Sequence, residues 1–171
     1  MKPVRWLLIW TVLGLYLPLT AAAPAAESAY APLRLYEGSW HVTRKDLPAG
    51  AKPDELKNQC ALVGKFFACQ QTVNGAISAL LLLIPTDKPG HYVTQNVNLQ
   101  GRALGGGNLE ISGNRWVFSS RWDQGGKTTF YQTINVFSGK DHIHFEQQES
   151  DNGKDWTVKN SGDDTRIGVG R

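Results

Sequence analysis

The stretch Cys60-Ala-Leu-Val-Gly-Lys-Phe-Phe-Ala-Cys69 decides the fold, because it predicts a turn, a strand pairing and a covalent bond together. With Gly64-Lys65 as a two-residue type II′ turn, the flanking residues become paired antiparallel strands in which Cys60 faces Cys69. The cysteines then form a non-hydrogen-bonded pair, where Cα atoms lie about 4.5 Å apart, a separation that a disulfide spans. The alternative is two buried free thiols. We predict a Cys60–Cys69 disulfide in an antiparallel β protein.

The first residues have the pattern of a secretory signal peptide. Lys2 and Arg5 form a basic start, residues 6–19 are uncharged and mostly apolar, and small residues fill 21–26. This order of basic, apolar and small residues is what signal peptidase substrates share. The alternative is an uncleaved membrane anchor, which a glycine, a proline and the alanine tract make a poor fit.

The predicted organisation is therefore a signal peptide at 1–26, a linker at 27–32 and one domain at 33–171. No cysteine lies near the cleavage region, which excludes a lipid-anchored lipoprotein. The predicted location is the periplasm or the cell exterior, where disulfides persist. We expect no stable membrane insertion after cleavage.

The charge balance gives no support for a nucleic-acid partner. The chain has 18 Lys and Arg residues against 15 Asp and Glu residues, and removal of the signal peptide leaves 16 against 15. A near-neutral chain without a basic block lacks the electrostatic footprint of a nucleic-acid-binding protein.

The remaining chain alternates short strand patterns with turn signals. Strands are expected near 40–45, 59–73 (the disulfide hairpin), 76–84, 92–100, 109–111, 115–122, 128–137, 142–149, 156–158 and 165–167, and one helical or 3₁₀ turn at 32–36. Residues 54–57 are expected to form at most one turn, and 101–107 a glycine-rich connection. Eight to ten strands predict an all-β fold, and a single antiparallel up-and-down barrel is preferred to a sandwich because closure removes exposed edges.

Two strands carry predictions about which face is buried. Leu80–Ile84 is an uninterrupted apolar run, which predicts a strand buried on both sides. In 92–100 the predicted core face is the more apolar of the two alternating sets: Val93, Gln95, Val97 and Leu99.

Gly38-Ser-Trp40, at the start of the first strand, resembles the Gly-x-Trp signature of the lipocalin-like (calycin) barrels. With the central hairpin and Asp151-x-Gly153-x-x-Trp156, it makes the mature chain similar to a bacterial family of secreted lipocalin-like domains whose function is unassigned. The resemblance implies that Trp40 closes one end of the barrel. It also implies that Arg166, on the last strand, stacks on Trp40 as a cation–π pair.

Two neighbouring strands provide a candidate lining for a binding cavity. One face of the first carries Trp116, Phe118, Ser120 and Trp122, and one face of the second carries Phe130, Gln132, Ile134 and Val136. Aromatic walls with a few polar groups are typical of small-molecule sites. The alternative is a solid core.

The histidines are weak candidates for metal or haem. His142 and His144 lie about 6–7 Å apart on one strand face with Glu146, close enough to share a zinc ion. The residues that alternate with them are apolar and expected to face inward, so these histidines should face solvent. His41 and His91 are considered because a related set of small barrels binds haem through one histidine. His41 should point outward, which leaves His91, and we predict no cofactor.

Asp151-Asn-Gly-Lys-Asp-Trp156 resembles part of an Asp-box hairpin, in which aspartate oxygens accept hydrogen bonds from backbone N–H groups of the turn. It offers too few ligands for an EF-type calcium site and predicts a structural turn. The sequence contains no Gly-x-Ser-x-Gly and no local pairing of nucleophile and base, so no catalytic residue is predicted.

Three classes of function remain: a carrier of a small molecule, a structural or protein-interaction barrel of the cell envelope, and an enzyme whose site is assembled from distant strands. We predict the first, a periplasmic or secreted barrel that binds a small apolar or amphipathic ligand without a cofactor.

Overall fold

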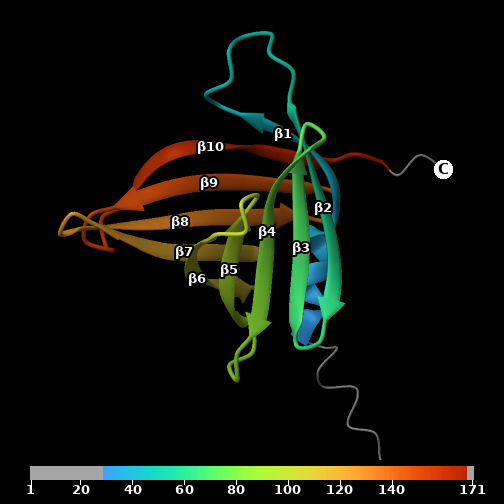
Figure 1. Ribbon diagram of the computed structural model, residues 1–171. Coiled ribbons are helices and arrows are strands. Elements are labelled where there is room, and N and C mark those ends of the chain that lie inside the picture. The colour runs from blue at the N-terminus through green and yellow to red at the C-terminus, as the bar shows by residue number, and fades with distance from the viewer. Residues whose placement is uncertain (1–28, 169–171) are drawn as a thin grey trace, which may run out of the picture.

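The computed structural model describes residues 29–168, and the predicted signal peptide, residues 1–26, lies outside the described part. The strands are β1 (Gly38–Arg44), β2 (Asp54–Val63), β3 (Phe66–Val73), β4 (Ala76–Pro85), β5 (His91–Asn98), β6 (Ala103–Ser112), β7 (Arg115–Gln124), β8 (Lys127–Ser138), β9 (His142–Ser150) and β10 (Thr157–Arg166), preceded by the 3₁₀ helix η1 (Pro32–Tyr36). Each strand pairs with its sequence neighbours, and β1 pairs with β10. The result is a closed antiparallel barrel (Figure 1), as predicted.

The disulfide hairpin forms with the predicted register. Cys60 pairs with Cys69 and is bonded to it, with a Cα–Cα distance of 4.0 Å. Gly64 has a φ of 61°, a conformation that a glycine adopts without strain in such a turn. The local symmetry of this stretch therefore determines its pairing in the folded chain.

Three stretches expected to be turns or breaks belong to strands. Residues 54–57 open β2, since the Asn74 side chain accepts a bond from the Glu55 backbone N–H (2.8 Å) and donates one to Asp54 (2.9 Å). Residues 103–107 belong to β6, where a Cβ on Gly107 would collide with the Ser119 carbonyl oxygen of β7. The glycines thus allow two strands to approach closely. The third stretch is the gap between the predicted strands 156–158 and 165–167. It is part of a single strand, β10, which has an irregularity between Val158 and Asn160.

The predicted buried faces of β4 and β5 are wrong. In β4, Leu81 is buried but Leu80 and Ile84 are each 37% exposed, so the strand is buried on one side only. In β5 the inward face starts with Tyr92 and Thr94, whereas Val93 is 44% exposed. The pairing with β4 fixes this orientation, and the inward face is more polar than the outward face. In a hollow barrel with polar groups inside, the more apolar face of a strand can therefore be the outward one.

The segment before β1 packs into the barrel from Ala29 onward. Leu33 is fully buried, and the Tyr30 hydroxyl donates to the Lys65 carbonyl oxygen at 2.6 Å. The Tyr92 hydroxyl donates to the Ala29 carbonyl oxygen at 2.6 Å. The last residues of the predicted linker are therefore part of the core. The described residues contain no helix whose length and hydropathy would suit a membrane span.

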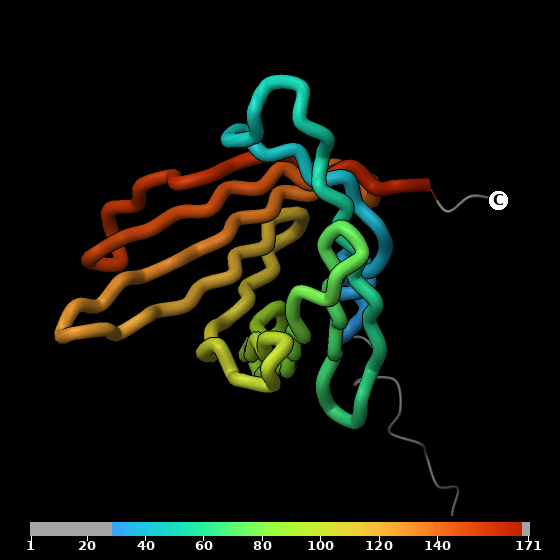
Figure 2. The backbone as a smooth tube through the Cα atoms, turned by 45° about the horizontal axis from the view of Figure 1, so that its top comes forward, coloured from blue at the N-terminus to red at the C-terminus, as the bar shows by residue number. Residues whose placement is uncertain are grey.

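The long hairpins of β7–β8 and β9–β10 project to one side of the barrel (Figure 2). The aromatic core lies in the other half of the barrel interior, where Trp40, Phe67, Trp116 and Phe137 are buried with Leu33. The side of the barrel away from the projecting hairpins is therefore filled by aromatic and leucine side chains.

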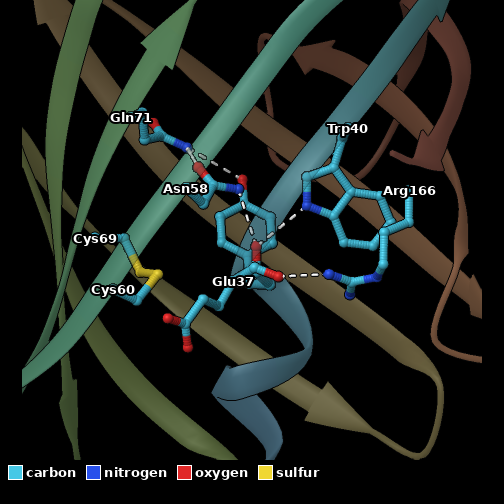
Figure 3. The surroundings of a disulfide bond; sticks show 8 residues. Glu37, Trp40, Asn58, Cys60, Cys69, Gln71 and Arg166 are labelled. Atoms are coloured by element: carbon cyan, nitrogen blue, oxygen red, sulfur yellow. Dashed lines mark hydrogen bonds between the residues drawn. A yellow bond between two sulfur atoms is a disulfide. The ribbon is translucent and has the colours of Figure 1, made fainter. Parts of the chain in front are cut away.

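Trp40 and Arg166 lie as the resemblance implies. They are paired across β1 and β10, and the guanidinium carbon of Arg166 lies 4.0 Å from the centre of the Trp40 ring system. Arg166 also donates to the carbonyl oxygens of Leu35 (2.9 Å) and Glu37 (2.6 Å), as Figure 3 shows for Glu37. Gly38 has a φ of 124°, and a Cβ there would collide with the guanidinium. The glycine of the motif therefore makes room for the arginine.

Candidate ligand-binding cavity

A cavity of about 390 Å³ occupies the barrel interior beside the aromatic core. Nine of the ten strands and η1 contribute to it; its lining residues are Tyr36, Val42, Leu56, Gln71, Leu81, Asn96, Phe118, Thr133, Asn135, Phe145, Gln147 and Asp164. Five of these side chains are aliphatic or phenylalanine, and the others are polar. A mixture of apolar walls and a few polar groups suits an amphipathic small molecule.

The polar network around Asn58 orders one wall of the cavity (Figure 3). The buried Asn58 side chain donates to the Tyr36 carbonyl oxygen at 3.0 Å and accepts from the Gln71 amide at 3.0 Å. The same Gln71 amide lies 3.4 Å from the Tyr36 hydroxyl oxygen. Because each group in this chain restrains the next, η1 is held against β2 and β3.

Tyr36 stands between this network and the aromatic core. Its ring lies 6.2 Å from the Trp116 ring and 6.1 Å from the Phe118 ring. Burial, and then the negative charge of Asp164, raises the pKa of Tyr36 to about 12. The hydroxyl group is therefore neutral at physiological pH and presents a hydrogen-bond donor to the cavity.

Asp164 is the carboxyl group of the cavity. Its residue is only 7% exposed, and its Oδ1 atom has no hydrogen-bond partner among the described residues. Burial, and then the neighbouring Asp163, raises the pKa of Asp164 to about 7. Both protonation states of Asp164 are therefore populated near neutral pH.

A second hollow of about 350 Å³ lies toward the projecting end of β7 and β8. Trp122, Tyr131 and the glycines of β6 line it, and it shares Asn96 with the first cavity. A smaller hollow between them shares residues with both, including Phe118 and Tyr131. The three hollows thus follow one another along the barrel interior, from the core to the projecting hairpin.

The predicted lining of β7 lies on the inner face. Phe118 lines the cavity, and Trp122, which is 51% exposed, lines the second hollow. Trp116 is buried next to the cavity, with its ring centre 4.7 Å from that of Phe137. Along the inner face of β7, Trp116 therefore belongs to the core, Phe118 to the cavity and Trp122 to the second hollow.

The predicted lining of β8 is on the wrong face. Pairing places Trp116 opposite Asn135 and Phe118 opposite Thr133, so Thr133 and Asn135 point inward. Phe130, Gln132 and Ile134 alternate with the inward residues and lie on the outer face. There the Gln132 amide donates to Gln148 at 2.6 Å. The prediction followed hydrophobicity, but the inward face of β8 is the more polar one.

The polar lining of the cavity was missed by the sequence analysis, Asp164 above all. One signal could have revealed it: Asp164 precedes Arg166 by two residues in a strand, so both share a face. Since Arg166 was predicted to lie over an inward tryptophan, Asp164 had to point into the barrel.

The histidines lie away from the cavity. His142 and His144 flank Asp163 on the outer face of the barrel, at 3.7 Å and 3.0 Å from its Oδ1 atom. His41 is exposed, and His91 is half-buried at the start of β5. Within residues 29–168, no group of three or more histidine, cysteine, aspartate or glutamate side chains is arranged to hold a metal ion.

The turn after β9 is built as a side-chain-capped turn, but by other side chains than expected. Asn152 Oδ1 accepts from the backbone N–H groups of Lys154 (2.8 Å) and Asp155 (2.9 Å). Ser150 Oγ accepts from that of Gly153 (2.9 Å). The predicted aspartate oxygens are thus replaced by an asparagine and a serine oxygen.

Together, the strand pairing and the hollows define a small closed β-barrel that contains several neighbouring cavities. No protein-family model matches the sequence, and no curated protein matches it either. Among solved structures it is similar to Rv2717c from M. tuberculosis, at 16% sequence identity and a TM-score of 0.49, over 82% of this chain and 98% of that chain.

Proposed function

We propose that the protein binds a small amphipathic ligand inside the barrel and acts as a carrier or receptor for it. The observation that supports this proposal is the cavity of about 390 Å³, which lies among apolar walls and polar groups. Its volume falls in the range of about 300–1,000 Å³ that is usual for small-molecule sites.

We also propose that the protein works in the periplasm or outside the cell, as a member of the lipocalin-like barrels. The Cys60–Cys69 disulfide supports an oxidising compartment. The Gly38-x-Trp40 motif with Arg166 supports the family assignment, since its geometry matches what the resemblance implies.

An enzyme is the weaker candidate. A buried carboxyl group with a raised pKa is common at catalytic sites, and Asp164 is such a group. However, the described residues that line the cavity include no serine, cysteine, histidine or second carboxylate that would act with it. A carrier requires only the space and the polar groups that are present.

The test is titration of the exported protein with N-phenyl-1-naphthylamine, a neutral apolar fluorophore that brightens in apolar surroundings. We expect saturable binding that is at least tenfold weaker in Thr133→Trp, because an indole at this inward position fills the cavity. Ile134→Trp is the matched control, since this neighbouring residue lies on the outer face and should leave binding unchanged.

Circular dichroism would establish that both variants fold, with Leu81→Trp as a second cavity-filling variant. Equal binding by wild type, Thr133→Trp and Leu81→Trp would place the fluorophore outside the cavity and reject the proposal. Absence of saturable binding to wild type would favour the structural or protein-interaction barrel.

A further inference from the structure

We propose that the ligand carries a protonated amine, which Asp164 binds inside the barrel while the apolar part of the ligand packs on Leu81, Phe118 and Phe145. This inference rests on the proposed function of the cavity and adds the chemical class of its ligand.

The first reason is the unsatisfied state of Asp164. A buried carboxylate is stable only when donors compensate for the water that it has lost, yet Asp164 Oδ1 has no partner among the described residues. Asp164 is also one of the residues that line the cavity. A donor supplied by a ligand would therefore satisfy an atom that the fold leaves unsatisfied.

The second reason is that the nearest arginines along the strands are engaged elsewhere. Arg166, two residues further on the same face, binds the Trp40 ring and the carbonyl oxygens of the η1 region. Arg44, on β1, contacts Asp46 and Asp54 at 3.5 Å each, although its buried Nε atom has no hydrogen-bond partner among the described residues. Both arginines thus have their charged contacts with groups other than Asp164, and neither lines the cavity.

The third reason is the charge of the remaining surroundings. None of the twelve described lining residues is lysine or arginine. From η1 the neutral Tyr36 faces Asp164, and the paired residues on β1 and β9 are Val42 and Ile143. On the outer face of β10, Asp163 lies between His142 and His144. The cavity therefore selects for a positive charge and against a carboxylate.

The other polar groups of the cavity are compatible with an ammonium group. An ammonium has three N–H donors, of which one or two would bind a carboxylate. Asn96, Asn135 and Gln147 line the same cavity and carry amide oxygens that accept hydrogen bonds. The cavity therefore carries hydrogen-bond acceptors besides Asp164 for the protons of an amine head group.

The pKa of Asp164 predicts how the affinity for an amine should change with pH. The pKa of Asp164 is raised to about 7, so this carboxyl is mostly protonated at pH 6 and mostly ionised at pH 8. A cationic amine binds the ionised form, and its affinity should rise about tenfold over this interval. A ligand that accepts a hydrogen bond from the protonated acid would bind more weakly at pH 8.

The experiment uses n-octylamine, n-octanol and n-octanoate, which share a chain and carry a positive, a neutral and a negative head. Each displaces N-phenyl-1-naphthylamine from the exported protein at pH 6 and pH 8. We expect octylamine to bind at pH 8 at least tenfold more tightly than the other two, and about tenfold more weakly at pH 6. Asp164→Asn should abolish this preference while octanol binding remains, and Asp163→Asn, the outward neighbour, should retain it.

The outcomes separate the two proposals. Displacement by octanol or octanoate as strong as that by octylamine in wild type would overturn the amine assignment and leave the carrier function intact. So would an amine preference that survives in Asp164→Asn. Failure of the fluorophore and of all three compounds to bind would reject both. The comparison of octylamine, octanol and octanoate in wild type at the two pH values tests the amine assignment even if Asp164→Asn does not fold.

Discussion

At the residue scale, Asp164 and Asp163 show how one strand gives two identical side chains opposite environments. Asp163 lies on the outer face beside two histidines, whereas Asp164 lies in the cavity with an unpartnered oxygen. Burial is the first cause of the raised pKa of the inward carboxyl. The fold therefore tolerates a destabilising group at the point where a ligand would contact it.

The pH dependence of stability follows from this pKa. In the folded chain the pKa of Asp164 is about 7, above its ordinary value of 3.8, so between these values the folded state binds more protons than the unfolded state. Asp164 should therefore lower the free energy of unfolding as pH rises from about 4 to 7, by at most about 1.4 kcal/mol per pH unit. Asp164→Asn should remove this loss and be more stable than wild type at pH 8.

Urea denaturation of wild type and Asp164→Asn between pH 5 and 8 measures this difference. Asp163→Asn removes a carboxylate from the same strand on the exposed side. It should retain most of the pH-dependent loss of stability, because Asp163 is only the second cause of the raised pKa of Asp164. Parallel pH profiles for wild type and Asp164→Asn would show that Asp164 ionises at its ordinary pKa in the folded protein.

At the element scale, the disulfide hairpin could be predicted in full and the face of β8 could not. The hairpin is decided by residues that are close in sequence: a glycine at the turn and a symmetric run on each side of it. The face of β8 is decided by its pairing with β7, and through it by the whole barrel. Its inward residues, Thr133 and Asn135, are polar, so a rule that places apolar residues inside selects the opposite set. The same rule failed for Val93 in β5.

The disulfide should contribute to stability mainly by restricting the unfolded chain. For a loop as short as that between Cys60 and Cys69, we expect the double replacement by serine to lower the free energy of unfolding by about 2 to 3 kcal/mol. Denaturation of the wild type with and without a reducing agent provides the matched comparison. Thiol titration of the unreduced, denatured protein should find no free cysteine, and two reactive thiols would contradict the bond.

At the scale of the whole molecule, Arg166 joins the barrel where its first and last strands meet. Its guanidinium stacks on Trp40 and donates to the Lys140 carbonyl oxygen at 2.8 Å, in addition to the carbonyl oxygens before β1. Arg166→Ala should therefore lower the free energy of unfolding by about 2 kcal/mol, through the lost cation–π and charged hydrogen bonds.

Chemical denaturation tests this expectation against Arg121→Ala, which removes an exposed arginine that forms a surface ion pair with Asp123. The control should change stability by about 0.5 kcal/mol or less. Fluorophore binding by Arg166→Ala should stay close to that of wild type, because Arg166 does not line the cavity. An unchanged stability would exclude the closing role of Arg166.

The pairing of β1 with β10 also fixes the order in which the protein can be completed. During synthesis β1 is made early and β10 last, so until β10 emerges both β1 and β9 have an unpaired edge. The contacts of Arg166 with Leu35 and Glu37 span 131 and 129 residues of chain, the kind of long-range closure that is slow to form. The barrel therefore remains open until β10 is available, and in this interval its exposed edges are where a chaperone would act.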